Sequence, residues 1–309
     1  MKGVLLVNMG GANSPMELKK FLSNMFKDPF ILPYGRVIRN ILSFIISNAR
    51  YKKSWQKYKL IGGSPIIDNT KKAVVLLQEK LDEGYCVKMA FSYSFPQIKF
   101  SIKELINQGI NDITVIPLYP QSSISTTSSV EKDVYDAVSK DKYLKINVIK
   151  EFYDKEGFVM FWSTLISNHI KKNNYSNPHI VFSAHSIPKF LVEKGDTYPI
   201  AIESSAKLIA GKLGYDYEFA YQSGMKKSKW IGPYTKDILK KMAENGKDEI
   251  VIIPISFVSE NLETLYDIDY ELIPFAKEKL LIKNISRVEI PIENNQFIEL
   301  LKDLTKQII

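Results

Sequence analysis

His185 is the first residue whose type and position suggest chemistry, because it follows the apolar run "VFSA" (181–184) and Pro188 comes within one turn. The chain has only three histidines, at 169, 179 and 185. Histidine titrates near neutral pH, and its neutral ring binds transition metals. A lone histidine is more often a core or capping residue, so only its place at the end of a predicted strand favours a function.

The stretch "SENLETLYDIDYEL" (259–272) supplies a second candidate, since Glu263, Asp267 and Glu271 recur at every fourth residue. On an α-helix these carboxylates lie along one face and repel unless a cation or solvent compensates. Most acidic stripes are solvated faces, but this one begins at the end of a predicted strand. A histidine opposed by carboxylates can take protons or pass a divalent metal ion inward, and the spacing matches no closed zinc site. We interpret it as a transit track.

The elements that position these residues can be predicted from the pattern of the chain. Short apolar, β-branched runs alternate with amphipathic stretches of helix length along the whole sequence. The predicted strands are 3–8, 85–92, 112–117, 145–150, 179–184, 217–222, 249–256 and 286–291. The predicted helices are 15–26, 36–48, 71–82, 98–108, 128–138, 156–172, 200–213, 235–245, 261–279 and 295–307. Such alternation predicts parallel sheets with helices on both faces and ligands beyond the carboxyl ends of the strands.

The two halves of the chain also resemble each other, as "DITVIPLYPQS" (112–122) and "EIVIIPISFVS" (249–259) illustrate. The sequence therefore predicts an α/β fold of two similar Rossmann-like domains, each a parallel sheet flanked by helices, with an active-site cleft between them. We expect an N-terminal domain over 1–150 and a second over 151–291. The C-terminal helical segment 292–309 is expected to pack back on the first domain.

Charge and cysteine content restrict the partners. Lys plus Arg number 42 and Asp plus Glu number 34, a formal charge of +8 that suits an anionic small molecule or an acidic membrane surface. No nucleic-acid-binding motif is present, so no nucleic-acid partner is expected. The single cysteine, Cys86, provides no disulfide framework and no iron–sulfur ligand set. With no signal-peptide pattern and no apolar run long enough to span a bilayer, we expect a cytoplasmic protein.

Seven motifs in chain order resemble those of the ferrochelatases, the enzymes that insert Fe²⁺ into a porphyrin in haem synthesis. They are "VLLVNMGG" (4–11), "FLSNMFKDPFILP" (21–33, a pocket-lip segment), "IGGSPI" (61–66), "PLYPQSSISTTSS" (117–129), "FSAHSIP" (182–188) with "GDTYP" (195–199), "YQSGMKKSKWIGP" (221–233) and "PISFVSENLETLYDIDYE" (254–271). One such motif is weak evidence, whereas seven in order are specific.

The resemblance implies a role for each matching position. His185 and Glu263 match the catalytic residues, and Asp267 and Glu271 extend a metal transit track that begins at those two. The positions that match porphyrin contacts are Met9, Met25, Phe26, Ile31, Arg50, Tyr58, Ser64, Tyr119, Gln121, Tyr198 and Phe257.

Three departures from the family pattern stand out. Glu260 and Asn261 occupy a place where Asp-His is usual, and Asn261 cannot carry a proton. Ser92 replaces a frequent arginine. The segment Gly224–Met225–Lys226–Lys227 replaces a basic residue followed by Val-Gly-Pro.

The implied reaction converts protoporphyrin IX and Fe²⁺ to protohaem with release of two protons, by a monomer that needs no cofactor and carries no iron–sulfur cluster. Zn²⁺ is an expected substitute in vitro. A coproporphyrin III ferrochelatase, another tetrapyrrole chelatase and a non-enzymatic tetrapyrrole carrier remain alternatives. A more polar substrate would favour basic residues at the lip, where Met25, Phe26, Phe30 and Ile31 stand instead.

The predicted helix 36–48 has an apolar stripe beside basic residues. Ordinary core packing is the favoured interpretation, and the alternative is a lip that touches a membrane at its periphery. The stripe consists of Val37, Ile38, Ile41, Leu42 and Ile45.

Overall fold

The computed structural model describes residues 1–138, 144–224 and 228–306, so Met225, Lys226 and Lys227 of the sixth motif and the end of the C-terminal segment (307–309) lie outside the described residues. The chain divides into two compact units. The first comprises residues 1–151 together with the segment from Ile292 on, and the second comprises Phe152–Pro291.

Each unit is built on a four-stranded parallel sheet, and the two sheets have the same strand order. In the first unit the order is β2-β1-β3-β4, from β1 (Lys2–Asn8), β2 (Tyr85–Phe91), β3 (Asp112–Pro117) and β4 (Lys145–Val148). In the second it is β6-β5-β7-β8, from β5 (His179–His185), β6 (Tyr217–Gln222), β7 (Glu249–Ile253) and β8 (Asn284–Arg287). The predicted duplicated α/β fold is confirmed, with β8 lying slightly earlier than its predicted range.

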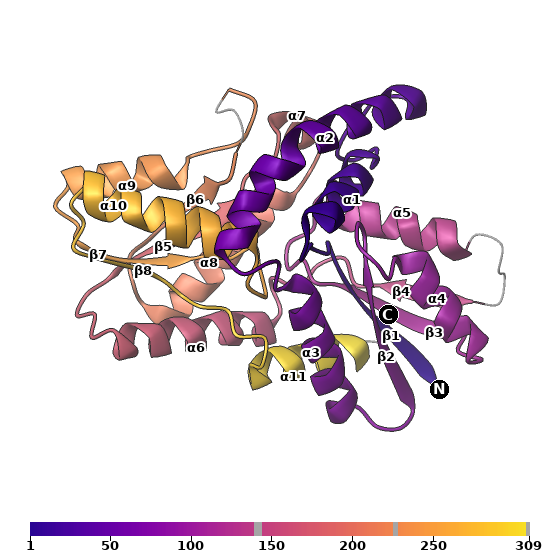
Figure 1. Cartoon of the computed structure of the whole chain (residues 1–309). Helices are drawn as coiled ribbons and strands as arrows, with labels where there is room; N and C mark the ends of the chain where they lie inside the picture. The colour runs from indigo at the N-terminus through magenta and orange to yellow at the C-terminus, as the bar shows by residue number, and fades with distance from the viewer. Residues whose placement is uncertain (139–143, 225–227, 307–309) are drawn as a thin grey trace. The chain divides into compact units, whose positions relative to one another are not determined.

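The helices follow the strands in alternation (Figure 1). They are α1 (Pro15–Phe26), α2 (Arg36–Leu60), α3 (Ile66–Lys80), α4 (Ile98–Asn107), α5 (Thr127–Val138), α6 (Glu156–Lys172), α7 (Lys189–Glu193), α8 (Tyr198–Leu213), α9 (Thr235–Glu244), the π-helix η1 (Glu263–Leu272), α10 (Ile273–Lys279) and α11 (Asn295–Lys306). Only α7 was not predicted, because its single short turn carries no period that a sequence can show.

Both sheets are buried on both faces, as all-parallel sheets require. In the first unit α4 and α5 cover one face, and α3 and α11 pack together against the other (Figure 1). In the second unit α9, η1 and α10 share one core with the sheet, whereas α6 and α8 pack together on the other side. The strands β1, β3, β5 and β7 are accordingly apolar along nearly their whole length.

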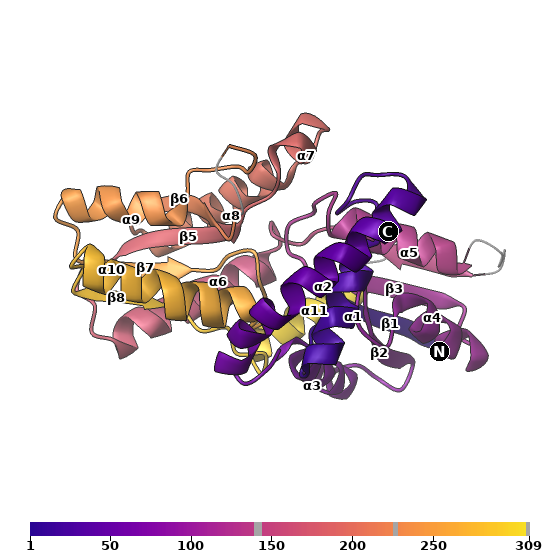
Figure 2. The same cartoon turned by 45° about the horizontal axis from the view of Figure 1, so that its top comes forward.

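Helix α2 departs from its prediction in length and in orientation. It runs on to Leu60 and packs beside α1 (Figure 2) through two buried serines, Ser43 and Ser47. Ser43 Oγ donates a hydrogen bond to the Ser23 carbonyl at 2.8 Å. These small side chains let the two helices approach closely, and they leave the apolar residues on the opposite side of α2.

The core-packing prediction for this stripe is therefore wrong. Most of its side chains are more than half exposed: Val37 72%, Ile38 54%, Ile41 56% and Ile45 54%, with Phe44 beside them at 68%. We call these five residues the apolar face of α2. Within the described residues, no helix is both long enough and apolar enough to cross a membrane.

The predicted helix 261–279 is present but has two parts. Residues Glu263–Leu272 form the π-helix η1, and α10 continues directly from Ile273. A π-helix bonds each N–H to the carbonyl five residues back; it is rare, and many examples lie at functional sites. Its buried residues Ile268 and Leu272 belong to the core that α9 and the sheet share.

Candidate active site

His185 is the last residue of β5, and its backbone is held on both sides. Its N–H donates to Ser256 Oγ at 3.0 Å, and its carbonyl accepts from the Tyr198 hydroxyl at 3.0 Å. Its partner in the parallel register is Gln222 at the end of β6. The imidazole itself is half-buried, so the sheet fixes the residue while part of the ring stays accessible.

Two polar side-chain atoms at this strand end are buried without a hydrogen-bond partner in the described part of the chain: His185 Nδ1 and Gln222 Nε2. Trp230 packs its edge near the imidazole, with ring centroids 6.3 Å apart. Buried polar atoms are almost always paired, so neighbouring exceptions point to a group that a ligand, ion or water satisfies.

Tyr198, a predicted porphyrin contact, is buried, and its hydroxyl is used within the protein. Burial raises the pKa of this phenol far above its usual range, so the hydroxyl remains a donor to the His185 carbonyl. In this structure the Tyr198 hydroxyl therefore holds the backbone of His185 in place.

The three carboxylates of the acidic track, Glu263, Asp267 and Glu271, all lie on η1. Glu263 and Asp267 are half-buried and Glu271 is exposed, so the track leads from solvent towards the interior. Asp267 Oδ2 accepts a hydrogen bond from Ser223 Oγ at 2.8 Å, which ties η1 to the residue after β6.

In the first unit, Ser64 lies against the glycine turn that follows β1. Its N–H donates to Asn13 Oδ1 at 2.9 Å, whereas its hydroxyl oxygen is buried and has no partner among the described residues. A Cβ on Gly11 would lie 2.1 Å from Ser64 Oγ, so only glycine permits this approach. Gly10 also has a positive φ of 98°, which favours glycine.

The remaining predicted porphyrin contacts differ in exposure. Phe26, Tyr58 and Gln121 are buried, and Arg50 is exposed. The half-buried ones are Met9, Met25, Ile31, Tyr119 and Phe257. Tyr58 stacks on Trp55 with ring centroids 6.4 Å apart. Their roles stay predictions.

Comparison with known proteins identifies the chain. The family model for ferrochelatase matches residues 1–308. The ferrochelatase of Aquifex aeolicus is 38% identical over 311 residues, covering 99% of this chain and 98% of the relative. The ferrochelatase of Sulfurihydrogenibium sp. is 32% identical, covering 98% and 97%.

This chain belongs to the ferrochelatase family.

Solved chelatases share its fold at low sequence identity. The structure described as SirB from Bacillus subtilis with Fe³⁺ superposes with a TM-score of 0.60 at 13% identity, covering 99% of this chain and 96% of that one. CbiX, described as the terminal enzyme of sirohaem biosynthesis in denitrifying bacteria, gives a TM-score of 0.55 at 12% identity, and both chains are covered completely. At such identities the likeness extends to the fold alone.

Asn261, which stands where ferrochelatases usually have a histidine, caps the π-helix. Its side-chain oxygen accepts from the backbone N–H groups of Glu263 at 2.9 Å and Thr264 at 3.1 Å, and its amide donates to the Ser259 carbonyl at 3.2 Å. The free N–H groups at a helix start need such an acceptor. Asn261 cannot relay a proton, and its side chain instead fixes the start of the π-helix at Glu263.

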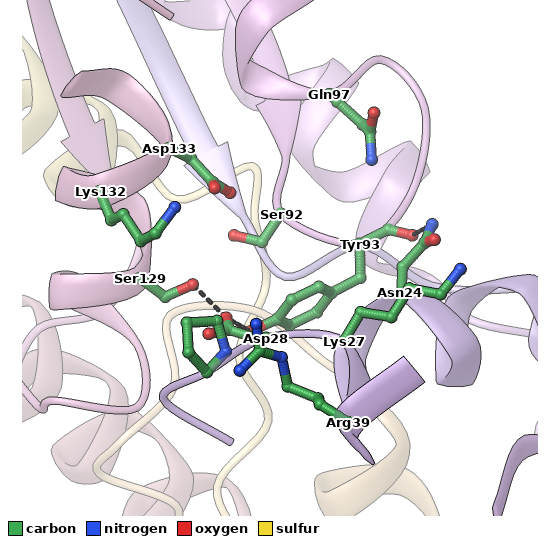
Figure 3. A pocket seen from close by; sticks show the side chains of 11 residues that line it. Asn24, Lys27, Asp28, Arg39, Ser92, Tyr93, Gln97, Ser129, Lys132 and Asp133 are labelled. Atoms are coloured by element: carbon green, nitrogen blue, oxygen red, sulfur yellow. Dashed lines mark hydrogen bonds between the residues drawn. The ribbon is translucent and has the colours of Figure 1, made fainter. Parts of the chain in front are cut away.

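Ser92, the second departure from the ferrochelatase pattern, lines a cavity of about 330 Å³ in the first unit (Figure 3). The buried Asp28 at this cavity accepts from the Tyr93 hydroxyl at 2.7 Å, from Ser129 Oγ and from the Phe30 N–H at 2.8 Å. Burial and the nearby Asp28 keep the pKa of Tyr93 well above its usual range, so its hydroxyl acts as a donor.

Asp133 faces the same cavity from α5 (Figure 3). Burial, with a further contribution from Asp28, raises the pKa of its carboxyl to about 6. Three basic residues also line the cavity, Lys132 from α5 and, apart from it, Lys27 and Arg39 (Figure 3). The position at which many ferrochelatases place an arginine is therefore surrounded by charged groups of both signs.

Metal ligands are not gathered into a resident site in the described chain. No group of three or more histidine, cysteine, aspartate or glutamate side chains is placed there to hold a metal ion. Divalent iron enters the ferrochelatase reaction as a substrate, and a half-buried histidine and a graded row of carboxylates fit a substrate ion.

Sequence reasoning missed two residues that bind the site residues from distant parts of the sequence. Ser256 binds the backbone of His185, and Ser223 binds Asp267. Both serines lie inside the motifs quoted above, Ser223 in 221–233 and Ser256 in 254–271, but neither was assigned a role. In the structure Ser223 has a positive φ of 61°, a conformation that serine rarely adopts.

Proposed function

We propose that this protein is a ferrochelatase, a lyase that inserts Fe²⁺ into protoporphyrin IX to form protohaem and releases two protons. The observation that carries the proposal is the end of β5. There His185 presents a buried ring nitrogen with no partner in the described chain, and the same unit supplies half-buried carboxylates from η1.

Porphyrin metalation requires that two pyrrole protons leave and that the metal ion lose its water. The neutral imidazole of His185 can accept a proton or bind Fe²⁺. Glu263 can stabilise the incoming cation or take the second proton. One divalent cation enters as two protons leave, so the charge beside the carboxylates is the same before and after the exchange.

The acidic track provides a path for either the ion or the protons. Glu271 is exposed and can collect a hydrated cation, whereas Asp267 and Glu263 are half-buried and can replace its lost water with carboxylate oxygens. No further cofactor enters the proposal.

The first unit holds most of the proposed porphyrin contacts, and Tyr198 and Phe257 belong to the second. Arg50 and Ser64 hold propionates, and Met25 and Ile31 contact the apolar ring edge. The apolar face of α2 contacts a membrane surface peripherally, where a poorly soluble porphyrin partitions, with Arg36 beside it. The proposal places the enzyme in the cytoplasm, at such a surface.

The test supplies the purified protein with Fe²⁺ under anaerobic conditions and compares protoporphyrin IX with coproporphyrin III. Metalation is followed by the porphyrin absorption bands. We expect insertion into both porphyrins, faster with protoporphyrin IX, because the lip is apolar. Faster turnover of coproporphyrin III would correct the substrate, and porphyrin binding without insertion would support a carrier.

A further inference from the structure

A buried arginine binds two carboxylates that lie on either side of Glu263 and Asp267 in the sequence. Arg287, the last residue of β8, has a side chain that is only 4% exposed. Its Nη1 binds Glu260 Oε1 at 2.8 Å and the Val288 carbonyl at 3.0 Å. Its Nε and Nη2 bind the two oxygens of Asp269 at 2.9 and 2.7 Å. We call Glu260, Arg287 and Asp269 the clamp.

The clamp holds the chain just before the π-helix and again within its second half. Glu260 lies just before the helix begins, and Asp269 lies in its second half. Glu260 is itself tied down, because it also accepts from the Ile290 N–H at 2.8 Å and from Thr264 Oγ1. The catalytic candidate Glu263 and the track residue Asp267 lie between these two fixed points.

A π-helix of this length needs such anchors. The i→i+5 pattern occurs mostly as single-turn bulges, and the same residues can form an α-helix instead. A change from one pattern to the other would rotate every following side chain about the axis. The planar guanidinium, bound by both oxygens of Asp269 and by Glu260, permits only one spacing between the two carboxylates.

We propose that Arg287 is a positioning residue: by binding Glu260 and Asp269 together it holds the π-helical register that aims Glu263 and Asp267. The inference rests on the proposed function, since it assigns those carboxylates to metal insertion. Arg287 does not itself contact the metal or the porphyrin. It acts only through the helix.

The alternative is an ion cluster that contributes to stability and nothing else. Buried clusters of this kind are weak stabilisers, and replacing all members with neutral residues is often harmless, whereas removing one leaves buried charges unpaired. This difference separates stability from positioning.

The experiment compares Arg287→Met with the triple variant Glu260→Gln, Asp269→Asn, Arg287→Met. The single variant should lose both thermal stability and kcat. The triple variant should regain most of the melting temperature, because no carboxylate of the clamp remains unpaired. Its kcat should stay about 10- to 100-fold below wild type, since small displacements of reacting groups have effects of that size. Porphyrin affinity, measured by fluorescence, should not change.

Arg287→Lys and Lys241→Met are the conservative variant and the control. A lysine keeps the charge but cannot bind both carboxylates in the same fork, so kcat should fall between those of wild type and Arg287→Met. Lys241 forms an exposed pair with Glu218 at 3.6 Å in the same unit. Its removal should change neither stability nor kcat.

Hydrogen exchange of the η1 amides tests the clamp without any activity. We expect faster exchange across Glu263–Leu272 in the triple variant, while β5 and β7 remain protected. A triple variant with wild-type kcat and wild-type exchange would overturn the proposal. A wild-type protein that inserts no metal, combined with faster η1 exchange in the triple variant, would reject the proposed function and leave the clamp standing.

Discussion

At the residue scale, His185 combines a fixed backbone with a side chain that is only half-buried. Ser256 and Tyr198 bind its N–H and its carbonyl, and both bonds use backbone atoms of His185. Replacing the side chain therefore leaves the end of β5 anchored.

His185→Ala should lower kcat by about 10²- to 10⁴-fold, the usual contribution of a proton-transfer residue. The melting temperature should stay close to that of wild type, because no hydrogen bond of the imidazole to the described chain is lost. Steady-state kinetics and a thermal melt are the measurements. A large loss of stability with normal activity per folded molecule would instead identify a core histidine.

Neutral isosteres along the acidic track should act in a graded way. Glu263→Gln, at the start of η1, should lower kcat at least about tenfold. Asp267→Asn should have a smaller effect, and Glu271→Gln, at the exposed end, the smallest, with a loss that higher Fe²⁺ concentration recovers. Kinetics over a range of Fe²⁺ concentrations measure the order. Wild-type kinetics in all three variants at every Fe²⁺ concentration would mean that the track is only a solvated face.

Asp133 should make the stability of the first unit depend on pH. Its pKa of about 6 lies above the value in an unfolded chain, so the folded state binds more protons between roughly pH 4 and 6. The contribution of Asp133 to stability therefore falls as pH rises through that window and stays low above it. Asp133→Asn should raise the free energy of unfolding at pH 7.5 by about 1–2 kcal/mol and by almost nothing at pH 4.

Urea unfolding at both pH values measures this difference. Asp136→Asn on the same helix is the control, because Asp136 is exposed and pairs with Lys132. An equal gain at pH 4 and 7.5 would contradict the role of Asp133 protonation.

Residue positions that depend on strand ends were predictable, and those that depend on distant partners were not. His185 follows an apolar run, and the carboxyl ends of parallel strands are where ligands bind. Ser256 reaches His185 across 71 residues of sequence and Ser223 reaches Asp267 across 44, and no local pattern records such contacts. Arg287 was missed for the same reason.

At the element scale, α2 shows why a correct helix prediction assigned the wrong face to the core. Periodicity reveals that one side of a helix is apolar, and an apolar side normally faces a core. Here the buried side is formed by Ser43 and Ser47, which serve close packing against α1. The π-helix escaped prediction because its hydrophobic spacing resembles that of an α-helix, while its hydrogen bonds do not.

The exposed apolar face of α2 should bind membranes. Ile41→Ser with Phe44→Ser should weaken binding to anionic vesicles by about tenfold or more, because each side chain can bury apolar surface in the headgroup region. Stability should be unchanged, since neither side chain is buried. Vesicle sedimentation measures the binding. Ile200→Ser, at a side chain 66% exposed on α8, is the matched control and should bind like wild type.

At the scale of the whole molecule, the first unit is discontinuous in sequence. Helix α11 returns to pack beside α3, and its inner face, which includes Phe297, Leu301 and Leu304, is fully buried. The strong amphipathic pattern of α11 made the helix predictable. Its packing partner was only an expectation, because periodicity does not name the surface that covers an apolar face.

Leu301→Ala should destabilise the first unit by about 2–5 kcal/mol, the usual cost of a cavity at a fully buried leucine. Hydrogen exchange should show the loss in β1 and β3. Protection of β5 and β7 should persist, because they belong to the second unit. Equal loss of protection in both sheets would show that the units unfold together.

The return of α11 also delays completion of the first unit during synthesis on the ribosome. The first 151 residues emerge early, but the segment that completes their unit follows only after Phe152–Pro291 has been translated. At about 5–20 residues per second, that wait lasts roughly 7 to 28 s. During it the side of α3 that packs against α11 in the folded unit stays uncovered. Chaperone binding to the nascent chain should therefore be strongest while residues 152–291 are translated. A chain released at that stage should aggregate, because its first unit is incomplete.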